Sequence, residues 1–142
     1  MLDVVNLQKK VKIETAVYKE FVSTLVNKVE EARDSRLTVA FISDDRMKQL
    51  NSLFRNKDTT TDVLSFPHEP DEFEPKGDSF LGDIVISVEQ AQKQADENGL
   101  SLEGEIKQLI LHGLLHLCGY DHETDLGEMN ERELDLRSQL DI

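Results

Sequence analysis

An uncharged and mostly apolar stretch from Gln108 to Tyr120 constrains the fold of this chain more than any other segment. It is too short to cross a bilayer, which takes about 20 apolar residues, so it has to be buried inside a domain. From Leu109 onward its apolar residues surround nearly the whole helical circumference, a pattern typical of a central helix. The stretch therefore predicts a buried helix at about Ser101–Cys118 that ends before Gly119.

Three of the four histidines of the chain lie in this helix or directly after it. His112 and His116 are four residues apart, so both side chains project from the same helical face. Gly119 breaks the helix, and the chain can then turn back to bring His122 to the same point. Three neutral imidazoles around one open position are typical of a catalytic zinc site rather than a closed structural one. We therefore predict one divalent metal ion per chain, with Zn²⁺ the expected ion.

Two other interpretations of the histidines have to be weighed. If they were ordinary histidines, an almost wholly apolar helix would carry two polar rings that each need hydrogen-bond partners. A purely structural metal site would need a fourth protein ligand, and Cys118 lies about 200° around the helix from His116. His68, in an acidic segment at residues 68–79, is expected to be an exposed loop residue outside the ligand set.

The residue after the first histidine separates this chain from a well-known class of enzymes. The spacing of the three histidines is that of a class of zinc proteases. Those proteases carry a glutamate directly after the first histidine, where it serves as the general base. Here the position is Gly113, which cannot accept a proton. The pattern favours a metal-activated hydrolase whose other catalytic groups come from elsewhere in the chain.

Hydrophobic periodicity and turn residues predict the remaining elements. The expected strands are Met1–Gln8, Leu37–Ser43, Thr61–Phe66 and Leu81–Ile86, and the expected further helices are Glu14–Arg33, Ser43–Phe54, Ser87–Gly99 and Leu126–Leu140. Met47, Leu50 and Phe54 would form the core face of the second of these helices, and a capping box at Ser87 would begin the third. These elements predict a single α+β domain, residues 1–142. In it, helices cover a small mixed sheet of about four strands, and the metal site lies on the central buried helix.

The net charge of −13 is unevenly distributed, which limits what it says about partners. Residues 1–57 carry 11 Lys and Arg against 8 Asp and Glu, whereas residues 58–142 carry 5 against 21. An acidic protein is normally a poor binder of nucleic acid, but a local basic surface in the N-terminal part is compatible with one. The single cysteine excludes an intrachain disulfide, and the first residues lack the pattern of a signal peptide. We expect a cytoplasmic protein that does not enter a membrane.

The segment HGLLHLCGYDH at residues 112–122 resembles the signature of the YbeY family of bacterial rRNA maturation factors, which are small metal-dependent endoribonucleases. Two further segments resemble the family in the expected order. They are LNSLFRNKD with the following TDVLSFP, at residues 50–58 and 61–67, and LGDIVIS at residues 81–87. The resemblance covers the chain from about Leu37 to Leu140.

This resemblance implies that His112, His116 and His122 hold a zinc ion and that Arg55 is a functional residue. It also implies a single-strand-specific endoribonuclease that acts in 16S rRNA 3′-end maturation and ribosome quality control. The partners would be RNA of the small ribosomal subunit, with ribosome-associated proteins as further candidates and with no DNA and no membrane.

Arg55 suits such a reaction because a guanidinium is permanently charged and binds phosphate oxygens through two hydrogen bonds. Asp62 and Asp121 are candidates for orienting a histidine ring, although each is equally plausible as a turn residue. Two other functions stay open at this point. One is a different zinc metallohydrolase, such as a peptidase with an unusual base, and the other is a ribosome assembly factor whose metal site is mainly structural.

Overall fold

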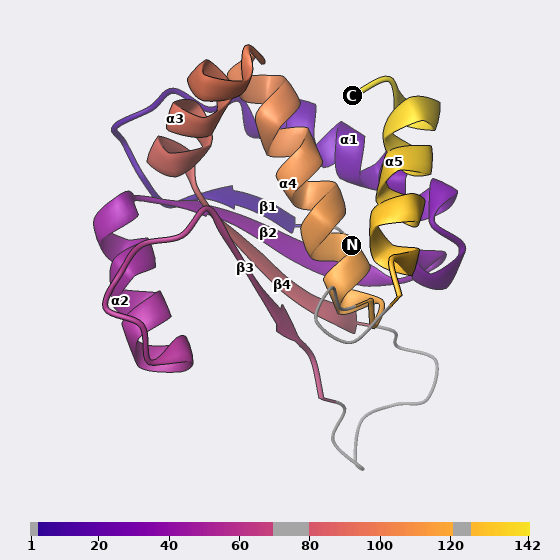
Figure 1. The fold of residues 1–142 in the computed structure, drawn as a ribbon, viewed down its shortest axis with the longest axis horizontal. Helices are drawn as coiled ribbons and strands as arrows, with labels where there is room; N and C mark the ends of the chain where they lie inside the picture. Colours follow the sequence, from indigo (N-terminus) through magenta and orange to yellow (C-terminus); the bar gives the residue numbers. More distant parts are fainter. Residues whose placement is uncertain (1–2, 70–79, 121–125) are drawn as a thin grey trace.

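One mixed sheet organises the described residues, 3–69, 80–120 and 126–142, of this computed structural model (Figure 1). Its strands are β1 (Asp3–Asn6), β2 (Arg36–Ile42), β3 (Val63–Pro67) and β4 (Phe80–Ser87). The helices are α1 (Thr15–Lys28), the 3-10 turn η1 (Glu30–Ala32), α2 (Asp44–Arg55), α3 (Val88–Asn98), α4 (Leu102–Leu117) and α5 (Glu128–Leu140). The predicted α+β fold with a small mixed sheet covered by helices is confirmed.

The strand order places β3 at one edge of the sheet. The order is β1-β2-β4-β3. The pairs β1–β2 and β2–β4 are parallel, and β3 is antiparallel to β4. All four predicted strands are present, each within two residues of its predicted bounds. Within the described residues, no helix is both long and apolar enough to cross a membrane.

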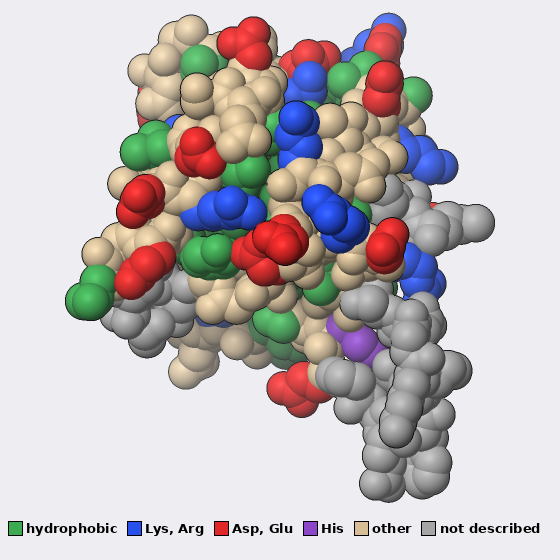
Figure 2. All heavy atoms as spheres, turned by 90° about the vertical axis from the view of Figure 1, so that its right-hand side faces the viewer, with side chains coloured by type: hydrophobic (Ala, Val, Ile, Leu, Met, Phe, Trp, Pro, Cys, Tyr) green, Lys and Arg blue, Asp and Glu red, His purple; other side chains and the backbone are tan. Residues whose placement is uncertain are grey.

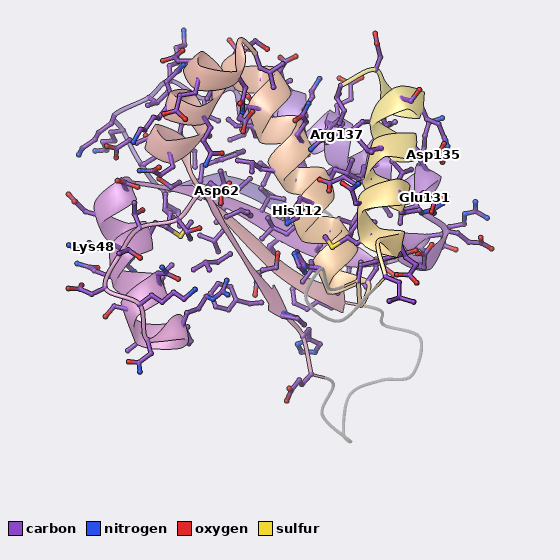
Figure 3. All side chains as sticks on the ribbon, in the orientation of Figure 1. Lys48, Asp62, His112, Glu131, Asp135 and Arg137 are labelled. Carbon is purple, nitrogen blue, oxygen red and sulfur yellow. The ribbon has the colours of Figure 1, made fainter. Side chains whose placement is uncertain are left out.

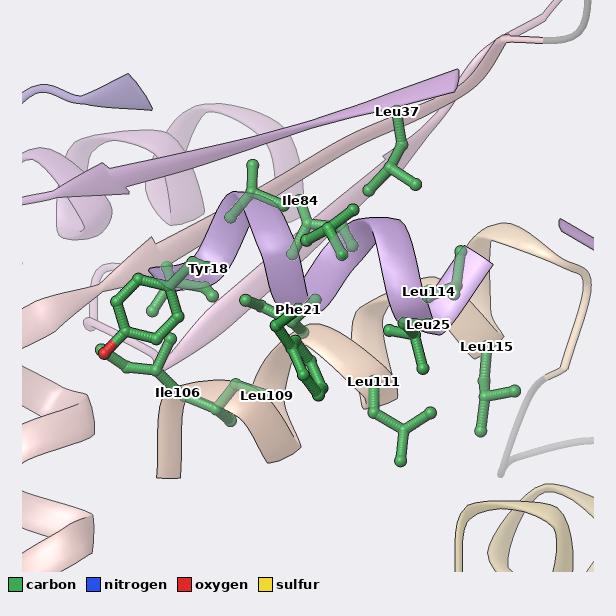
Figure 4. Packing of buried hydrophobic residues seen from close by; sticks show 14 of the residues in the cluster. Tyr18, Phe21, Leu25, Leu37, Ile84, Ile106, Leu109, Leu111, Leu114 and Leu115 are labelled. Atoms are coloured by element: carbon green, nitrogen blue, oxygen red, sulfur yellow. The ribbon is translucent and has the colours of Figure 1, made fainter. Parts of the chain in front are cut away.

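The main core lies between one face of the sheet and two helices, α1 and α4. Figure 4 shows Phe21 and Leu25 of α1 close to Leu111 and Leu114 of α4, with Ile84 of β4 beside them. These two leucines of α4 are fully buried, and the burial of a leucine stabilises the fold by about 2 kcal/mol. The prediction that this apolar stretch forms the central buried helix is therefore confirmed.

The helix α2 covers only part of the opposite face. The small core beneath it consists of Ile42, Met47, Leu64 and Val85. Met47 is fully buried and Leu50 partly, as predicted, but Phe54 is 61% exposed, so its assignment to the core face was wrong. The last turn of α2 lies past the border of this core, where the Phe54 ring rests edge-on against Phe66 at 5.2 Å.

The ends of the helices follow local backbone chemistry. The Ser43 and Ser87 hydroxyls accept the first free N–H groups of α2 and α3, as predicted from their cap residues. The reciprocal half of the expected capping box is replaced by a tertiary contact, because the Gln90 amide donates to Asp44 Oδ2. The helix α1 ends at Lys28, earlier than the predicted Arg33, because Val29 adopts an extended backbone and is fully buried.

Gly113 allows α4 to lie directly on the sheet. A Cβ atom at this position would be 2.9 Å from Ile84 Cγ2 and 3.1 Å from Ser65 Oγ. Both distances are shorter than ordinary van der Waals contact. The Ser65 hydroxyl also donates to the carbonyl oxygen of Gly113 at 3.3 Å. The helix therefore meets β3 and β4 at a point where only a residue without a side chain fits.

Gly113→Ala should lower the free energy of unfolding by up to about 2 kcal/mol. Overpacking a core costs about 1–3 kcal/mol, and the gain of about 1 kcal/mol in helix propensity offsets only part of that cost. Urea denaturation followed by circular dichroism measures the difference. Gly104→Ala is the matched control, because a Cβ there meets only the Ser101 hydroxyl at 3.2 Å. Equal effects of the two substitutions would contradict the close approach of α4 to the sheet.

Candidate functional site

A cleft of about 630 Å³ opens between α4, the edge strand β3 and the end of α2. Three segments far apart in the sequence line it: Arg55, residues 61–67, and the last turns of α4 with the residues that follow. Among the lining residues are Arg55, His112 and His116. The structure thus brings together in one cleft all the predicted site residues that it describes. His122 and Asp121 lie outside the described residues.

The two predicted ligands that the structure describes, His112 and His116, have the geometry of a ligand pair. His112 Nε2 and His116 Nε2 are 3.1 Å apart, and the two ring planes make an angle of 76°. A tetrahedral zinc ion with Zn–N bonds of about 2.0–2.1 Å holds two nitrogen ligands about 3.3 Å apart. The pair therefore fits one shared ion. Within the described part of the chain there is no group of three or more metal-ligating side chains, and the third predicted ligand lies outside that part.

The end of α4 brings the chain back beside this pair. Gly119 has φ +100°, a conformation that glycine adopts without strain, and its N–H donates to His116 O. The N–H of Tyr120 donates to Leu115 O, which completes the turn. The predicted helix end at Gly119 is confirmed. Cys118 lies at the cap itself, where burial and then the nearby Glu31 charge raise the pKa of its thiol to about 11.

Tyr120, on the rim of the cleft, is tied to two distant elements. Its hydroxyl donates to Glu31 Oε2 of η1 at 2.9 Å, and Arg132 of α5 contacts the other oxygen of Glu31 at 3.3 Å. Burial acts to raise the pKa of Glu31, but the backbone hydrogen bond, the Tyr120 hydroxyl and the Arg132 charge outweigh it and leave that pKa below its usual value. The contacts join residues 89 and 101 positions apart, so no local sequence signal could have revealed them.

The segment before β3 forms another wall and is held by two polar side chains. The buried Asn51 amide donates to Thr59 O at 2.8 Å. Asp44 accepts hydrogen bonds from Thr60, Ser87 and Gln90. Burial acts to raise the pKa of Asp44, but these three hydrogen bonds outweigh it and lower that pKa. The carboxylate therefore links α2, α3 and the cleft wall at one point.

Asp62, one of the two predicted orienting residues, lies in this wall (Figure 3). Its Oδ1 accepts the N–H of Val63 at 2.8 Å and the hydroxyl of Thr61 at 3.3 Å. These contacts are those of the turn residue that was the alternative. His68, expected to be exposed, is partly buried, and its ring lies edge-on to Phe80 at 5.1 Å.

Sequence analysis missed Glu133 of α5. Its two carboxylate oxygens each lie 3.3 Å from His112 Nδ1, and its side chain is only 8% exposed. The buried face of α5 consists of Met129, Glu133 and Leu136. A carboxylate within an apolar stripe at helical spacing was the signal that could have identified it, because a buried charge needs a partner.

Charge on the α5 side of the molecule is mixed. Figure 2 shows acidic and basic side chains interspersed over this face rather than gathered into one basic patch. Among the described residues that line the cleft, Arg55 is the one with a permanent positive charge. It follows that any anion bound in the cleft would be met by this guanidinium.

Comparison with known proteins gives consistent matches over most of the chain. The family model described as Endoribonuclease YbeY matches residues 3–141. A relative from Nautilia profundicola with the same description is 50% identical over 109 residues, which are 77% of this chain and 75% of the relative. A relative from Carboxydothermus hydrogenoformans, also described as Endoribonuclease YbeY, is 39% identical over 147 residues, with 100% of this chain and 99% of the relative covered.

A solved structure agrees with these sequence matches. The solution structure of TM1509 from Thermotoga maritima superposes with a TM-score of 0.64 at 31% identity, over 95% of this chain and 85% of that protein. The family match spans the cleft, including the Arg55 segment and the helix with the paired histidines. The chain therefore belongs to the YbeY family of endoribonucleases.

Proposed function

We propose that this protein is a metal-dependent, single-strand-specific endoribonuclease that acts in 16S rRNA 3′-end maturation and ribosome quality control in the cytoplasm. One observation carries the proposal: Arg55 lines the same cleft as His112 and His116, whose Nε2 atoms are 3.1 Å apart. This arrangement puts a phosphate-binding group beside a pair of metal ligands. Family membership supports the choice of RNA as substrate.

The two halves of the site have different tasks in this proposal. His112, His116 and His122 would hold one Zn²⁺, which supplies a water of lowered pKa or polarises a phosphoryl oxygen. Arg55 would bind the non-bridging oxygens of the scissile phosphate and stabilise the negative charge that grows there. Arg55 is exposed and ends α2, next to Asn56 in a left-handed conformation, so its side chain can reach an incoming strand.

The shape and charge of the molecule indicate how RNA would enter. The scissile phosphate has to pass between α2, β3 and α4, which a flexible single strand does more readily than a stiff duplex. The overall charge of −13 repels a polyanion. We therefore expect affinity for isolated RNA to be modest and the small ribosomal subunit, with ribosome-associated proteins, to present the strand. DNA is not an expected substrate.

The surroundings of Gly113 argue against the peptidase alternative. A side chain at this position would meet Ile84 and Ser65 under the sheet. A glutamate at the place where the zinc proteases carry their general base would therefore have to displace Ile84 or Ser65, and Ser65 itself lines the cleft. None of the described contacts favours peptide hydrolysis.

The purified protein should contain about one zinc per chain and cleave single-stranded RNA but not casein. His116→Ala should abolish both zinc binding and RNA cleavage, because it removes one of the paired nitrogen ligands. Metal analysis and gel assays of both substrates measure the outcome. His68→Ala is the matched control, because His68 does not line the cleft. Casein cleavage that depends on His116, or RNA cleavage that survives its loss, would contradict the proposal.

Arg55→Ala should lower kcat/KM for RNA about 10²–10³-fold, the usual loss when one group that stabilises transition-state charge is removed. Arg55→Lys should restore only part of the rate, because an ammonium group keeps the charge but not the paired hydrogen bonds. Zinc content should not change in either variant. Arg46→Ala is the control, since Arg46 is exposed on the same helix but does not line the cleft. Equal rates for the Arg55 and Arg46 variants would refute this role.

The logarithm of the RNA binding constant should fall linearly with the logarithm of the salt concentration, because phosphate contacts release counterions. Arg55→Ala should reduce the slope by about 0.7, the value for one phosphate contact on a single strand. Fluorescence anisotropy with a labelled oligonucleotide at several salt concentrations measures the slope. Tight binding that does not respond to salt would show that contacts other than phosphates dominate.

A further inference from the structure

The carboxylate of Glu133 is placed to control which nitrogen of His112 faces the cleft. Glu133 Oε1 and Oε2 are both 3.3 Å from His112 Nδ1, so this nitrogen points between them. A carboxylate has no proton to give, so the contact is a hydrogen bond only when Nδ1 carries the hydrogen. In the neutral ring the other nitrogen, Nε2, then carries a lone pair and no hydrogen. That is the nitrogen 3.1 Å from His116 Nε2.

A basic residue on the same helix compensates the cost of burying this carboxylate. Arg137, one turn later on α5, contacts Glu133 Oε1 at 3.4 Å. Figure 3 shows that His112 comes from α4 and Arg137 from α5. The chain of contacts therefore runs from Arg137 through Glu133 to His112 and crosses from one helix to the other. Such a pair holds the carboxylate in one place, since a buried charge without a partner would be strongly unfavourable.

Helix packing alone does not explain a charge at position 133. Met129 and Leu136 flank Glu133 on the buried face of α5, and both are almost completely buried. An apolar residue at 133 would extend this stripe, and replacing a buried ion pair by apolar residues is often neutral or stabilising. The carboxylate is better explained by its contact with the histidine ring than by the stability of the α4–α5 contact.

We infer that Glu133 is a positioning residue that holds His112 in the Nδ1–H form, so that its Nε2 lone pair faces the cleft before any metal binds. The inference rests on the proposed metal site, because the lone pair matters only if it binds an ion. Its chemistry is that of the outer partners of metal ligands, whose removal typically weakens metal binding about 10–100-fold.

The first test needs neither metal nor activity. Long-range ¹H–¹⁵N correlation spectra of the metal-free wild-type protein, at a pH at which imidazoles are neutral, distinguish the two ring forms of His112. We expect the Nδ1–H form to dominate. A dominant Nε2–H form in the wild-type protein would overturn the inference, whether or not any variant folds.

The second test compares two substitutions of the same chemical type. Glu133→Gln should increase the population of the Nε2–H form of His112, because its amide can donate to Nδ1 as well as accept from it. It should also raise the zinc dissociation constant about 10–100-fold, as measured by competition with a chelator. Glu105→Gln is the matched control, because Glu105 is another buried acid, on α4, about 10 Å along the helix from His112. It should change neither quantity.

The outcomes separate this inference from the proposed function. If the two variants lose thermal stability equally while the ring form and the zinc affinity of Glu133→Gln match the wild type, Glu133 is merely structural and the inference fails. If the wild-type protein binds no zinc, the proposed function fails, and the ring form of His112 alone then decides the role of Glu133.

Discussion

The contact between α4 and the sheet determines where the paired histidines lie. Because Gly113 has no side chain, the helix backbone approaches Ile84 and Ser65 closely enough for a hydrogen bond to form. This contact fixes the rotation of α4 about its own axis. One side of the helix is buried between the sheet and α1, and the side with the paired histidines then has to face β3. The position of the cleft is thus a consequence of core packing, and the two histidines project from the helix that packs against both the sheet and α1.

Sequence patterns predicted the features that depend on the spacing of residues close together in the chain. The strands are short β-branched and apolar runs between turn residues, and two histidines four residues apart lie on one helical face by geometry alone, so the sheet and the histidine pair could be anticipated. Phe54 could not be placed, because periodicity shows which side of a helix is apolar but not how far the sheet beneath it extends. The side chain of Gln90 was predicted to complete the capping box at Ser87, but it donates to Asp44 instead, because tertiary partners compete with local ones for the same side chain.

Contacts between distant segments were beyond the reach of such patterns. The hydrogen bond from Tyr120 to Glu31 joins residues that are 89 positions apart, and no local sequence pattern around either residue predicts it. Glu133 is an intermediate case, because its place in the buried stripe of α5 was visible but its partner was not. The role of His122 stays a prediction. The polar residues of the cleft wall have hydrogen-bond partners on three different elements. Their positions therefore depend on the folded tertiary structure and cannot be predicted from the sequence composition.

The glycine at position 113 also bears on how this kind of protein can change during evolution. Three histidines with protease-like spacing suggest that one substitution could convert a nuclease into a peptidase. The structure opposes that route, because the Cβ of a carboxylate residue introduced after the first histidine would lie 2.9 Å from Ile84 Cγ2 and 3.1 Å from Ser65 Oγ. Such a conversion requires α4 or these two side chains to shift, so it depends on the packing of the core as well as on the residue at position 113. Similar motifs in the two kinds of enzyme are therefore separated by a barrier of packing, although their sequences differ at this position by a single residue.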